Sequence, residues 1–242
     1  MIAAPASMSA PLAEARRRLA EAAGLIFDVD GTLAETEELH RAAFNEAFVQ
    51  AGLDWHWSRR IYHDLLRVPG GKERIRAFDQ LRRSGPPVSD KAIAELHRIK
   101  TERFAALMTA ASCPLRPGVQ ALLDAARGRG QKLAIATTTT RINIDALLAR
   151  IFGAQWEGMF AAVVAADDVA RKKPAPDAYL EVLSQLDLPA ASCLAFEDAG
   201  NGLRAAIRAG IPCIVTRSIY FRDDDFTGAL AVVDDLTALD MG

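Results

Sequence analysis

Residues 24–32 read GLIFDVDGT, a short apolar run that ends in two carboxylates and a glycine. The run is rich in aliphatic and aromatic side chains, and its length suits a strand buried on both faces of a parallel sheet. The glycine and threonine that follow turn the chain, so Asp28 and Asp30 can both reach one reaction centre where the strand ends. We expect this strand to be the centre of the fold and of the chemistry.

Beyond residue 114, segments with the patterns of strands and of helices alternate. Such alternation predicts a Rossmann-like α/β core, a doubly wound parallel sheet with helices on both faces. Ligands of such sheets bind at the carboxyl ends of the strands. The expected strands are 132–137, 159–165, 193–196, 211–215 and a short one near 231–233, and the expected helices are 119–127, 142–151, 177–185 and 202–209.

Between the first strand and this alternating region, apolar residues recur at three- and four-residue intervals, which indicates helices. Gly70-Gly71 and the segment 84–87 (SGPP) interrupt the pattern. We therefore predict an inserted α-helical cap domain. The expected divisions are an N-terminal leader at 1–23 that forms a solvated helix from residue 11, a core made of 24–34 and 115–242, and the cap at 35–114.

The 242-residue chain is 50% hydrophobic and has a formal net charge of −2, so it can build a large core but has no broad basic field. Nucleic acid and anionic membranes are therefore poor candidate partners. No stretch approaches the roughly 18–20 apolar residues that span a bilayer. Three cysteines without close pairing or metal-ligand spacing suit a reducing compartment. We expect a cytoplasmic monomer that acts on a small molecule.

Carboxylates end two of the predicted strands. Asp28 and Asp30 follow the first strand, and Glu197-Asp198 ends another. In one crevice these groups would repel each other and raise their pKa values unless a cation held them. Mg²⁺, which prefers oxygen ligands, is the expected cofactor, with its ligands among these four residues. A lone Asp-x-Asp pair is more often a solvated turn, but two strand ends with the same chemistry disfavour that alternative.

Donors for a phosphate follow two further strands. Thr137, Thr138 and Thr139 lie between a strand and a helix, so their hydroxyls and amides can hold an anion. Lys173, before Pro174, offers a point charge where phosphorus gathers negative charge in a transition state. The threonines could instead reflect strand propensity and helix capping, and the lysine could solvate a loop. The residues alone leave these alternatives open.

The predicted cap carries residues that could confer selectivity. Gly71 lets the backbone approach a ligand closely. Lys72, Arg74 and Lys100 offer cations for a second phosphate at the far end of a short sugar chain. Glu35 could accept hydrogen bonds from sugar hydroxyls. The three cations lie among many solvated charges, so a surface role stays open for each.

With these motifs in order, residues 24–234 resemble the haloacid dehalogenase superfamily, in its phosphatase and phosphomutase branch with a helical cap. The matching motifs are DVDGT at 28–32, Thr137, Lys173-Pro174 and Glu197-Asp198. Within that branch the chain is similar to the CbbY-type phosphatases, which dephosphorylate xylulose-1,5-bisphosphate, an inhibitor of Rubisco, and to β-phosphoglucomutase. The likeness to the CbbY type lies in LAETEELH at 33–40, GGKERI at 70–75, KTER at 100–103 and ATTT at 136–139.

These observations predict a covalent mechanism for a sugar-bisphosphate phosphatase. Uncatalysed hydrolysis of phosphate monoesters is so slow that a single general base could not suffice. We expect Asp28 to attack phosphorus, and Asp30 to act first as acid and then as base. Mg²⁺ would be held by Asp28, the backbone carbonyl of Asp30 and Asp198, and Thr137 and Lys173 would bind phosphoryl oxygens. The resemblance to the mutase implies that Lys100 contacts a substrate phosphate.

Two other functions stay open. A sugar phosphomutase would return the phosphate from Asp28 to another sugar hydroxyl instead of to water. A non-catalytic sugar-phosphate sensor is a candidate from another class, although binding alone gains little from a nucleophile paired with an acid. Phosphate release from xylulose-1,5-bisphosphate, conversion of β-glucose 1-phosphate, or the absence of any phosphoenzyme would distinguish the three.

Overall fold

A computed structural model of the chain describes residues 10–82, 86–110 and 113–240. In these residues, six parallel strands form one sheet in the order β3-β2-β1-β4-β5-β6. This order is that of a doubly wound Rossmann-like fold, so the predicted fold class is confirmed. The strands are β1 (Gly24–Phe27), β2 (Lys132–Ala136), β3 (Ala162–Val164), β4 (Cys193–Glu197), β5 (Cys213–Thr216) and β6 (Ala231–Val233).

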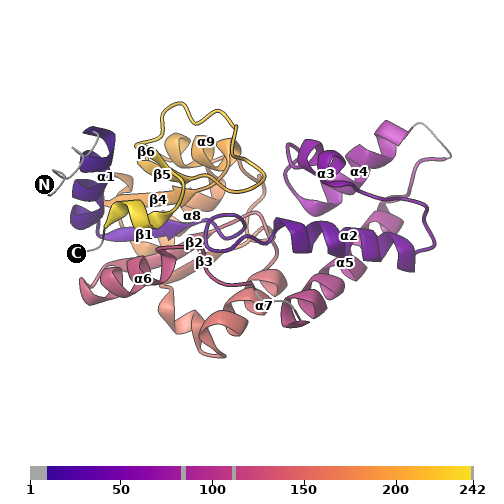
Figure 1. The fold of residues 1–242 in the computed structure, drawn as a ribbon, viewed down its shortest axis with the longest axis horizontal. Coiled ribbons are helices and arrows are strands. Elements are labelled where there is room, and N and C mark those ends of the chain that lie inside the picture. The colour runs from indigo at the N-terminus through magenta and orange to yellow at the C-terminus, as the bar shows by residue number, and fades with distance from the viewer. Residues whose placement is uncertain (1–9, 83–85, 111–112, 241–242) are drawn as a thin grey trace, which may run out of the picture.

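The side chains of the strands alternate between the two faces of the sheet and so divide the core into two layers. Phe27 of β1 belongs to one layer and stacks on Phe196 of β4, with 4.7 Å between the ring centroids. Its neighbour Ile26 belongs to the other layer. Helices α1 (Ala10–Glu21), α6 (Val119–Gly128) and α7 (Arg141–Phe152) pack on the first face, and α8 (Asp177–Leu186) and α9 (Gly200–Arg208) pack on the second (Figure 1).

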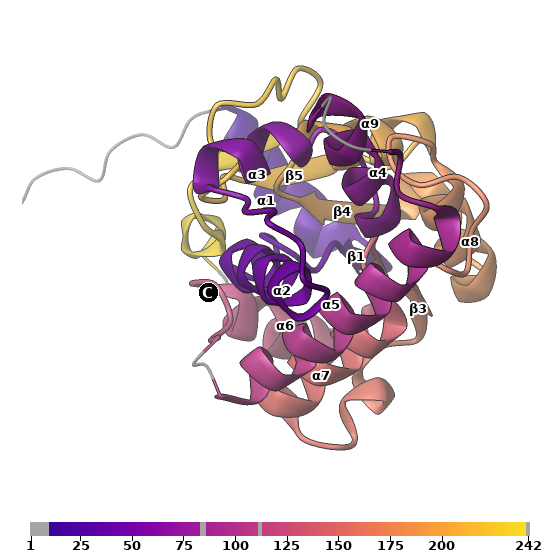
Figure 2. The ribbon, with the colours of Figure 1, turned by 90° about the vertical axis from the view of Figure 1, so that its right-hand side faces the viewer.

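The chain between β1 and α6 forms helices that stand beyond one end of the sheet, on the right in Figure 1 and facing the viewer in Figure 2. Phe44, Trp57 and Tyr62 lie in an apolar cluster of these helices, separate from the two layers around the sheet. Because this segment has its own core, we propose residues 35–114 as a cap domain. Its helices are α2 (Glu37–Gln50), α3 (Arg59–Leu65), α4 (Gly71–Arg82) and α5 (Asp90–Ala110).

The two connections between the cap and the sheet lie side by side. Ala34 and Leu115 form an isolated antiparallel bridge. The amide of Arg116 donates to the Leu33 carbonyl at 2.8 Å. The chain therefore leaves the core and returns to it at one place, just after the carboxyl end of β1.

The leader departs from the prediction of a solvated helix. Helix α1 forms, but Ala15 and Leu19 on one of its faces are buried in the core. Arg16 Nη2 also donates to the Ala238 carbonyl at 2.9 Å. The helix is therefore half-packed, because its alanine and leucine positions fall on the face turned toward η3 (Leu236–Leu239). Residues 1–9 of the leader lie outside the described residues.

Several boundaries also differ from those expected. The strand predicted at 159–165 begins only at Ala162, because Trp156–Met159 forms a 3-10 helix, η1, that buries the tryptophan. Helix α3 and the short 3-10 helix η2 (Ala190–Ser192) were not predicted. The interruption predicted at 84–87 lies partly outside the described residues. None of the helices in the described part of the chain has the length and apolar character needed to cross a membrane.

Candidate active site

Five polar side chains converge at the carboxyl ends of the strands. Asp28 follows β1, Thr137 follows β2, and Asp198 follows β4. Lys173 comes from the loop between β3 and α8, and its Nζ lies 2.7 Å from Asp28 Oδ1 and 2.6 Å from Glu197 Oε1. All five residues line one cavity. The structure thus brings together residues that lie up to 170 positions apart, 198 − 28, in the sequence.

Acceptors hold Lys173 from several sides. Besides the two carboxylates, its Nζ donates to the Ala136 carbonyl at 2.8 Å. The Tyr179 hydroxyl donates a short hydrogen bond to the same oxygen of Glu197 that accepts from the lysine. Burial alone would lower the pKa of Lys173, but the charges of Asp28 and Glu197 raise it above its ordinary value. The lysine is therefore a fixed cation beside Asp28.

Two glycines let carboxylates approach the main chain closely. Gly31 has a φ of +80°, and a Cβ at this position would lie 2.0 Å from Asp198 Oδ2. A Cβ at Gly202 would lie 2.1 Å from Glu197 Oε2. A side chain at either position would displace a carboxylate, so both positions require glycine.

Asp28, Glu197 and Asp198 form an acidic cluster whose ligand oxygens lie within 4.8 Å of one another. Burial raises the pKa of Asp28 to about 8 despite the nearby charge of Lys173. Burial, and then the charge of Asp28, raises the pKa of Asp198 well above its ordinary value. Asp198 Oδ2 is buried and has no hydrogen-bond partner among the described residues. A divalent cation would satisfy this oxygen and neutralise its neighbours, so the cluster fits Mg²⁺.

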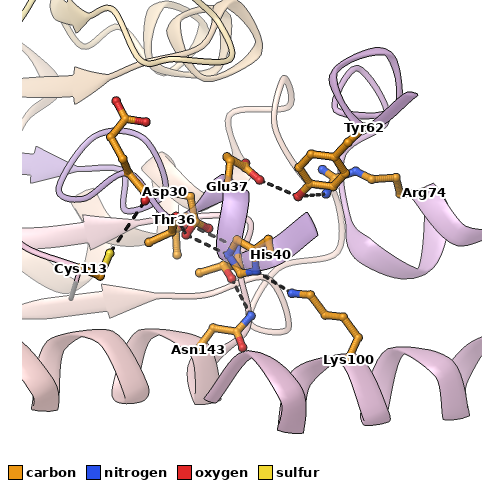
Figure 3. A network of polar contacts seen from close by, with 12 residues as sticks. Asp30, Thr36, Glu37, His40, Tyr62, Arg74, Lys100, Cys113 and Asn143 are labelled. Carbon is orange, nitrogen blue, oxygen red and sulfur yellow. Dashed lines mark hydrogen bonds and ion pairs between the residues drawn. The ribbon is translucent and has the colours of Figure 1, made fainter. Parts of the chain in front are cut away.

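The side chain of Asp30, the fourth residue expected to hold the metal, lies outside this cluster and turns toward the cap. Its Oδ1 accepts from Thr36 Oγ1 at 2.5 Å and lies 3.0 Å from His40 Nε2. His40 Nδ1 in turn lies 2.6 Å from Lys100 Nζ (Figure 3). Burial favours neutral Asp30, but the charge and hydrogen bond of His40 and the Thr36 hydroxyl lower its pKa to about 2. Asp30 is thus held as a carboxylate.

The threonine run lies between β2 and α7, and Thr137, Thr138 and Thr139 all line the cavity. The amide of Thr139 donates to Thr137 Oγ1 at 3.3 Å. Asn143, on the first turn of α7, donates from Nδ2 to Thr139 Oγ1 at 3.0 Å (Figure 3). These hydroxyls and the start of α7 form a polar wall that can face a phosphate.

The cap residues expected to bind substrate lie in different places. Gly71, Arg74 and Lys100 line the cavity that contains Asp28. Lys72 instead lines a neighbouring cavity between α5 and α7. The structure therefore does not bring Lys72 to the cavity that contains Asp28, although Arg74 follows it by only two residues.

Glu35 also lies away from that cavity. It lines a third cavity, at the junction of cap and core, where its Oε1 lies 3.4 Å from Arg116 Nε. The Glu35 carboxylate is therefore a partner of an arginine and not a neighbour of Asp28.

Glu37 takes the place in the cavity that the sequence suggested for Glu35. The Tyr62 hydroxyl donates to Glu37 Oε2 at 2.6 Å, and Arg74 Nη1 donates to the Tyr62 oxygen at 3.3 Å (Figure 3). The sequence analysis did not single out Glu37, Tyr62 or Asn143. Their only signal was their position on amphipathic helices, which does not show which face meets the cavity.

Lys100 is an unusually buried cation, with 4% of its surface exposed. Its Nζ lies 5.0 Å from the ring centroids of both Phe44 and Phe104. Burial lowers the pKa of Lys100 to about 7, although the charge of Asp30 opposes this effect. The charge of Lys100 therefore changes near neutral pH.

The fold and this acidic site define an α/β protein with a candidate site for a divalent cation, and comparison with known proteins gives its family. Residues 22–210 match the family model described as haloacid dehalogenase-like hydrolase. Protein CbbY of Rhodobacter capsulatus is 51% identical over 218 residues, which are 90% of this chain and 95% of that protein. The chain belongs to the haloacid dehalogenase-like hydrolase family.

Two solved structures extend the comparison. CbbY from Rhodobacter sphaeroides in complex with phosphate is 47% identical, with a TM-score of 0.87, and the match covers 90% of this chain and 96% of that chain. A variant of that protein in complex with xylulose-(1,5)bisphosphate is 46% identical, with a TM-score of 0.85, over 90% of this chain and 99% of that chain. The predicted resemblance to the CbbY type is confirmed, and the chain is an enzyme of the phosphatase kind.

Proposed function

We propose that the chain is a Mg²⁺-dependent phosphatase that removes a phosphate from a small sugar bisphosphate, with xylulose-1,5-bisphosphate as the substrate. One observation carries the proposal: a single cavity holds Asp28 and Lys173 from the core together with Arg74 and Lys100 from the cap. The first pair suits a phosphate that reacts, and the second pair suits a phosphate that only binds. The similar protein crystallised with xylulose-(1,5)bisphosphate supports this choice of substrate.

In the first step, a carboxylate oxygen of Asp28 attacks phosphorus, and the bond between phosphorus and the sugar oxygen breaks. Asp30 gives a proton to the leaving sugar oxygen. Lys173 and Thr137 stabilise the charge on the phosphoryl oxygens. Because Thr36 and His40 favour the carboxylate form of Asp30, we expect bound substrate to loosen these contacts, so that Asp30 takes up a proton from solvent before it acts as the acid.

In the second step, water attacks the phosphorus of the aspartyl-phosphate. Asp30, now a carboxylate, accepts a proton from the water, and the bond between Asp28 and phosphorus breaks. Inorganic phosphate leaves, Asp28 is again a carboxylate, and Asp30 returns its proton to solvent or gives it to the next leaving group. The contacts that lower the pKa of Asp30 to about 2 keep it ready for this step.

Asp28 and Asp198 are the residues that would hold Mg²⁺. When bound, the ion acts as a Lewis acid and orients the phosphate. Glu197 belongs to the same acidic cluster, but its Oε1 already accepts hydrogen bonds from Lys173 and Tyr179. We therefore assign Glu197 mainly to holding the lysine.

The cap would recognise the rest of the substrate. Arg74 and Lys100 provide the positive charge for the second phosphate, with Gly71 allowing a close approach of the main chain. Glu37, fixed by Tyr62, can accept hydrogen bonds from sugar hydroxyls. This arrangement replaces Glu35 and Lys72 with residues that line the cavity.

The test is an assay of the purified chain with xylulose-1,5-bisphosphate, with and without Mg²⁺, that measures free phosphate. We expect release only with Mg²⁺, and none from the Asp28→Asn variant. A parallel reaction with β-glucose 1-phosphate is scored for glucose 6-phosphate. Isomerised product without free phosphate would favour a mutase, and saturable binding without phosphoenzyme or product would favour a sensor.

A further inference from the structure

Arg116 stands where the chain re-enters the core after the cap, and only 8% of its side chain is exposed. Its Nη1 donates to the Gly31 carbonyl, and to the carbonyl and hydroxyl of Thr216 at 3.2 and 3.0 Å. Its Nη2 donates to the carbonyls of Arg217 at 2.6 Å and Asp234 at 2.9 Å. One side chain thus joins the turn after β1 to the ends of β5 and β6.

The contact with Gly31 links Arg116 to the catalytic residues. Gly31 follows Asp30 directly, and its amide donates to the Ala34 carbonyl at 2.8 Å. Asp198 lies so close that Gly31 has no room for a side chain. The direction of the Gly31 carbonyl therefore fixes the conformation of this turn. The Asp30 side chain projects from the turn, and Asp198 packs against it.

An arginine suits this position for a geometric reason. Its partners are mostly main-chain oxygens, of Gly31, Thr216, Arg217 and Asp234, and a guanidinium presents five donors in a rigid fork. Glu35, 3.4 Å from Nε, supplies a carboxylate, and its side chain is 32% exposed. A lysine could keep the charge, but its single nitrogen could not occupy the positions of both Nη1 and Nη2.

We propose that Arg116 is a positioning residue of the phosphoryl-transfer site. It holds the Gly31 carbonyl so that Asp30 and Asp198 keep the orientation needed for proton transfer and for binding the cation, and Glu35 supports it by pairing with Nε. The catalytic part of this inference rests on the proposed function. The part that concerns the turn itself does not.

A first experiment measures the turn without using activity. Amide hydrogen exchange is compared between residues 29–34 and strand β2 in the wild type, Arg116→Lys and Arg116→Met. Gln131→Met is the control, because the buried Gln131 Nε2 also donates to main-chain carbonyls, of Leu19 and Ala22, but before β2 and away from the cavity. We expect both Arg116 variants to speed exchange in 29–34 without affecting β2, and the control to leave 29–34 unchanged.

A second experiment measures catalysis of the same variants with xylulose-1,5-bisphosphate. We expect kcat of the Arg116 variants to fall by about 10²-fold, the effect of a displacement of roughly 1 Å at a reacting group, with little change in KM. Arg116→Lys should regain thermal stability relative to Arg116→Met but not kcat. The Gln131→Met control should lose stability and keep kcat.

Two results would overturn the inference. One is unchanged exchange in 29–34, or exchange that rises equally in β2. The other is a kcat of folded Arg116→Lys equal to that of the wild type. If the wild type itself releases no phosphate from any sugar bisphosphate, the proposed function fails, and the exchange comparison still decides whether Arg116 holds the turn.

Discussion

Lys173 Nζ lies 2.7 Å from Asp28 Oδ1, and both side chains are buried. Removing one member of such a pair leaves an uncompensated charge. The lysine opposes the rise in the pKa of Asp28 that burial causes, and Asp28 raises the pKa of the lysine. In the proposed mechanism, Asp28 attacks phosphorus and negative charge passes from its carboxylate to the phosphoryl oxygens. The lysine is placed to stabilise that charge before and after the transfer.

Asp28→Asn removes the nucleophile with almost no change in shape. We expect turnover to fall by about 10⁴-fold or more, and no phosphoenzyme to form, because an amide oxygen is a poor nucleophile. Phosphate release and trapping of labelled phosphoenzyme measure the effect. Asp145→Asn on the exposed surface of α7 is the control and should behave as the wild type. Substantial activity in Asp28→Asn would refute the assignment.

Asp198→Asn and Glu197→Gln should separate the metal ligand from the residue that holds the lysine. For Asp198→Asn we expect the Mg²⁺ concentration at half-maximal rate to rise at least about 10-fold, because a carboxylate ligand is lost. For Glu197→Gln we expect a lower kcat with a nearly unchanged Mg²⁺ requirement, because Lys173 loses a charged partner. Reaction rates measured over a range of Mg²⁺ concentrations show which of the two residues binds the cation. Equal shifts in both variants would make Glu197 a ligand as well.

Arg74→Met should weaken binding of a bisphosphate more than of a monophosphate. Because a charged hydrogen bond contributes roughly 1.5–3 kcal/mol, we expect KM for the bisphosphate to rise about 10- to 100-fold. Lys72→Met is the matched control on the same helix, since Lys72 lines a different cavity. Steady-state assays with both substrates give the comparison. A larger effect from Lys72→Met would reverse the assignment of the two cations.

Lys100→Met should stabilise the fold near neutral pH. Burial lowers the pKa of Lys100 from 10.5 to about 7, so the unfolded chain binds more protons between these pH values. The free energy of unfolding of the wild type should therefore rise with pH across this window. The variant should lack this rise and be more stable at pH 7, by about 1–4 kcal/mol.

Urea denaturation of both proteins at pH 6, 8 and 10 measures this difference. The same pH dependence in the two proteins would show that Lys100 is not the group responsible. Loss of bisphosphate binding in Lys100→Met, measured separately, would show that the buried charge is kept for recognition and not for stability.

The core and the convergence of polar residues at the edge of its sheet could be predicted because their signals are local. An apolar strand followed at once by Asp28, Thr137 or Asp198 shows both the element and its end. Parallel pairing then places all carboxyl ends at one edge, so residues distant in sequence can be brought together by topology alone. The start of β3 was misplaced because Met159, Phe160 and Ala161 continue the apolar run of the strand in the sequence, although Met159 ends η1.

The cap residues could not be assigned in the same way. Lys72 and Arg74 are two positions apart on α4, which turns their side chains about 200° from each other. Composition shows two cations but not which of them faces the cavity. Glu35 and Glu37 present the same ambiguity at the start of α2, and only the packing of Tyr62 and Arg116 decides it.

The bridge between Ala34 and Leu115 has a consequence for how such enzymes can diversify. Since the chain departs and returns through paired neighbours, a bundle of another size or shape could be grafted between them without altering the order of the strands. The residues at the carboxyl ends of the strands would stay in place, while the new cap would bind a different substrate. Substrate range and reaction chemistry can therefore evolve separately in this architecture.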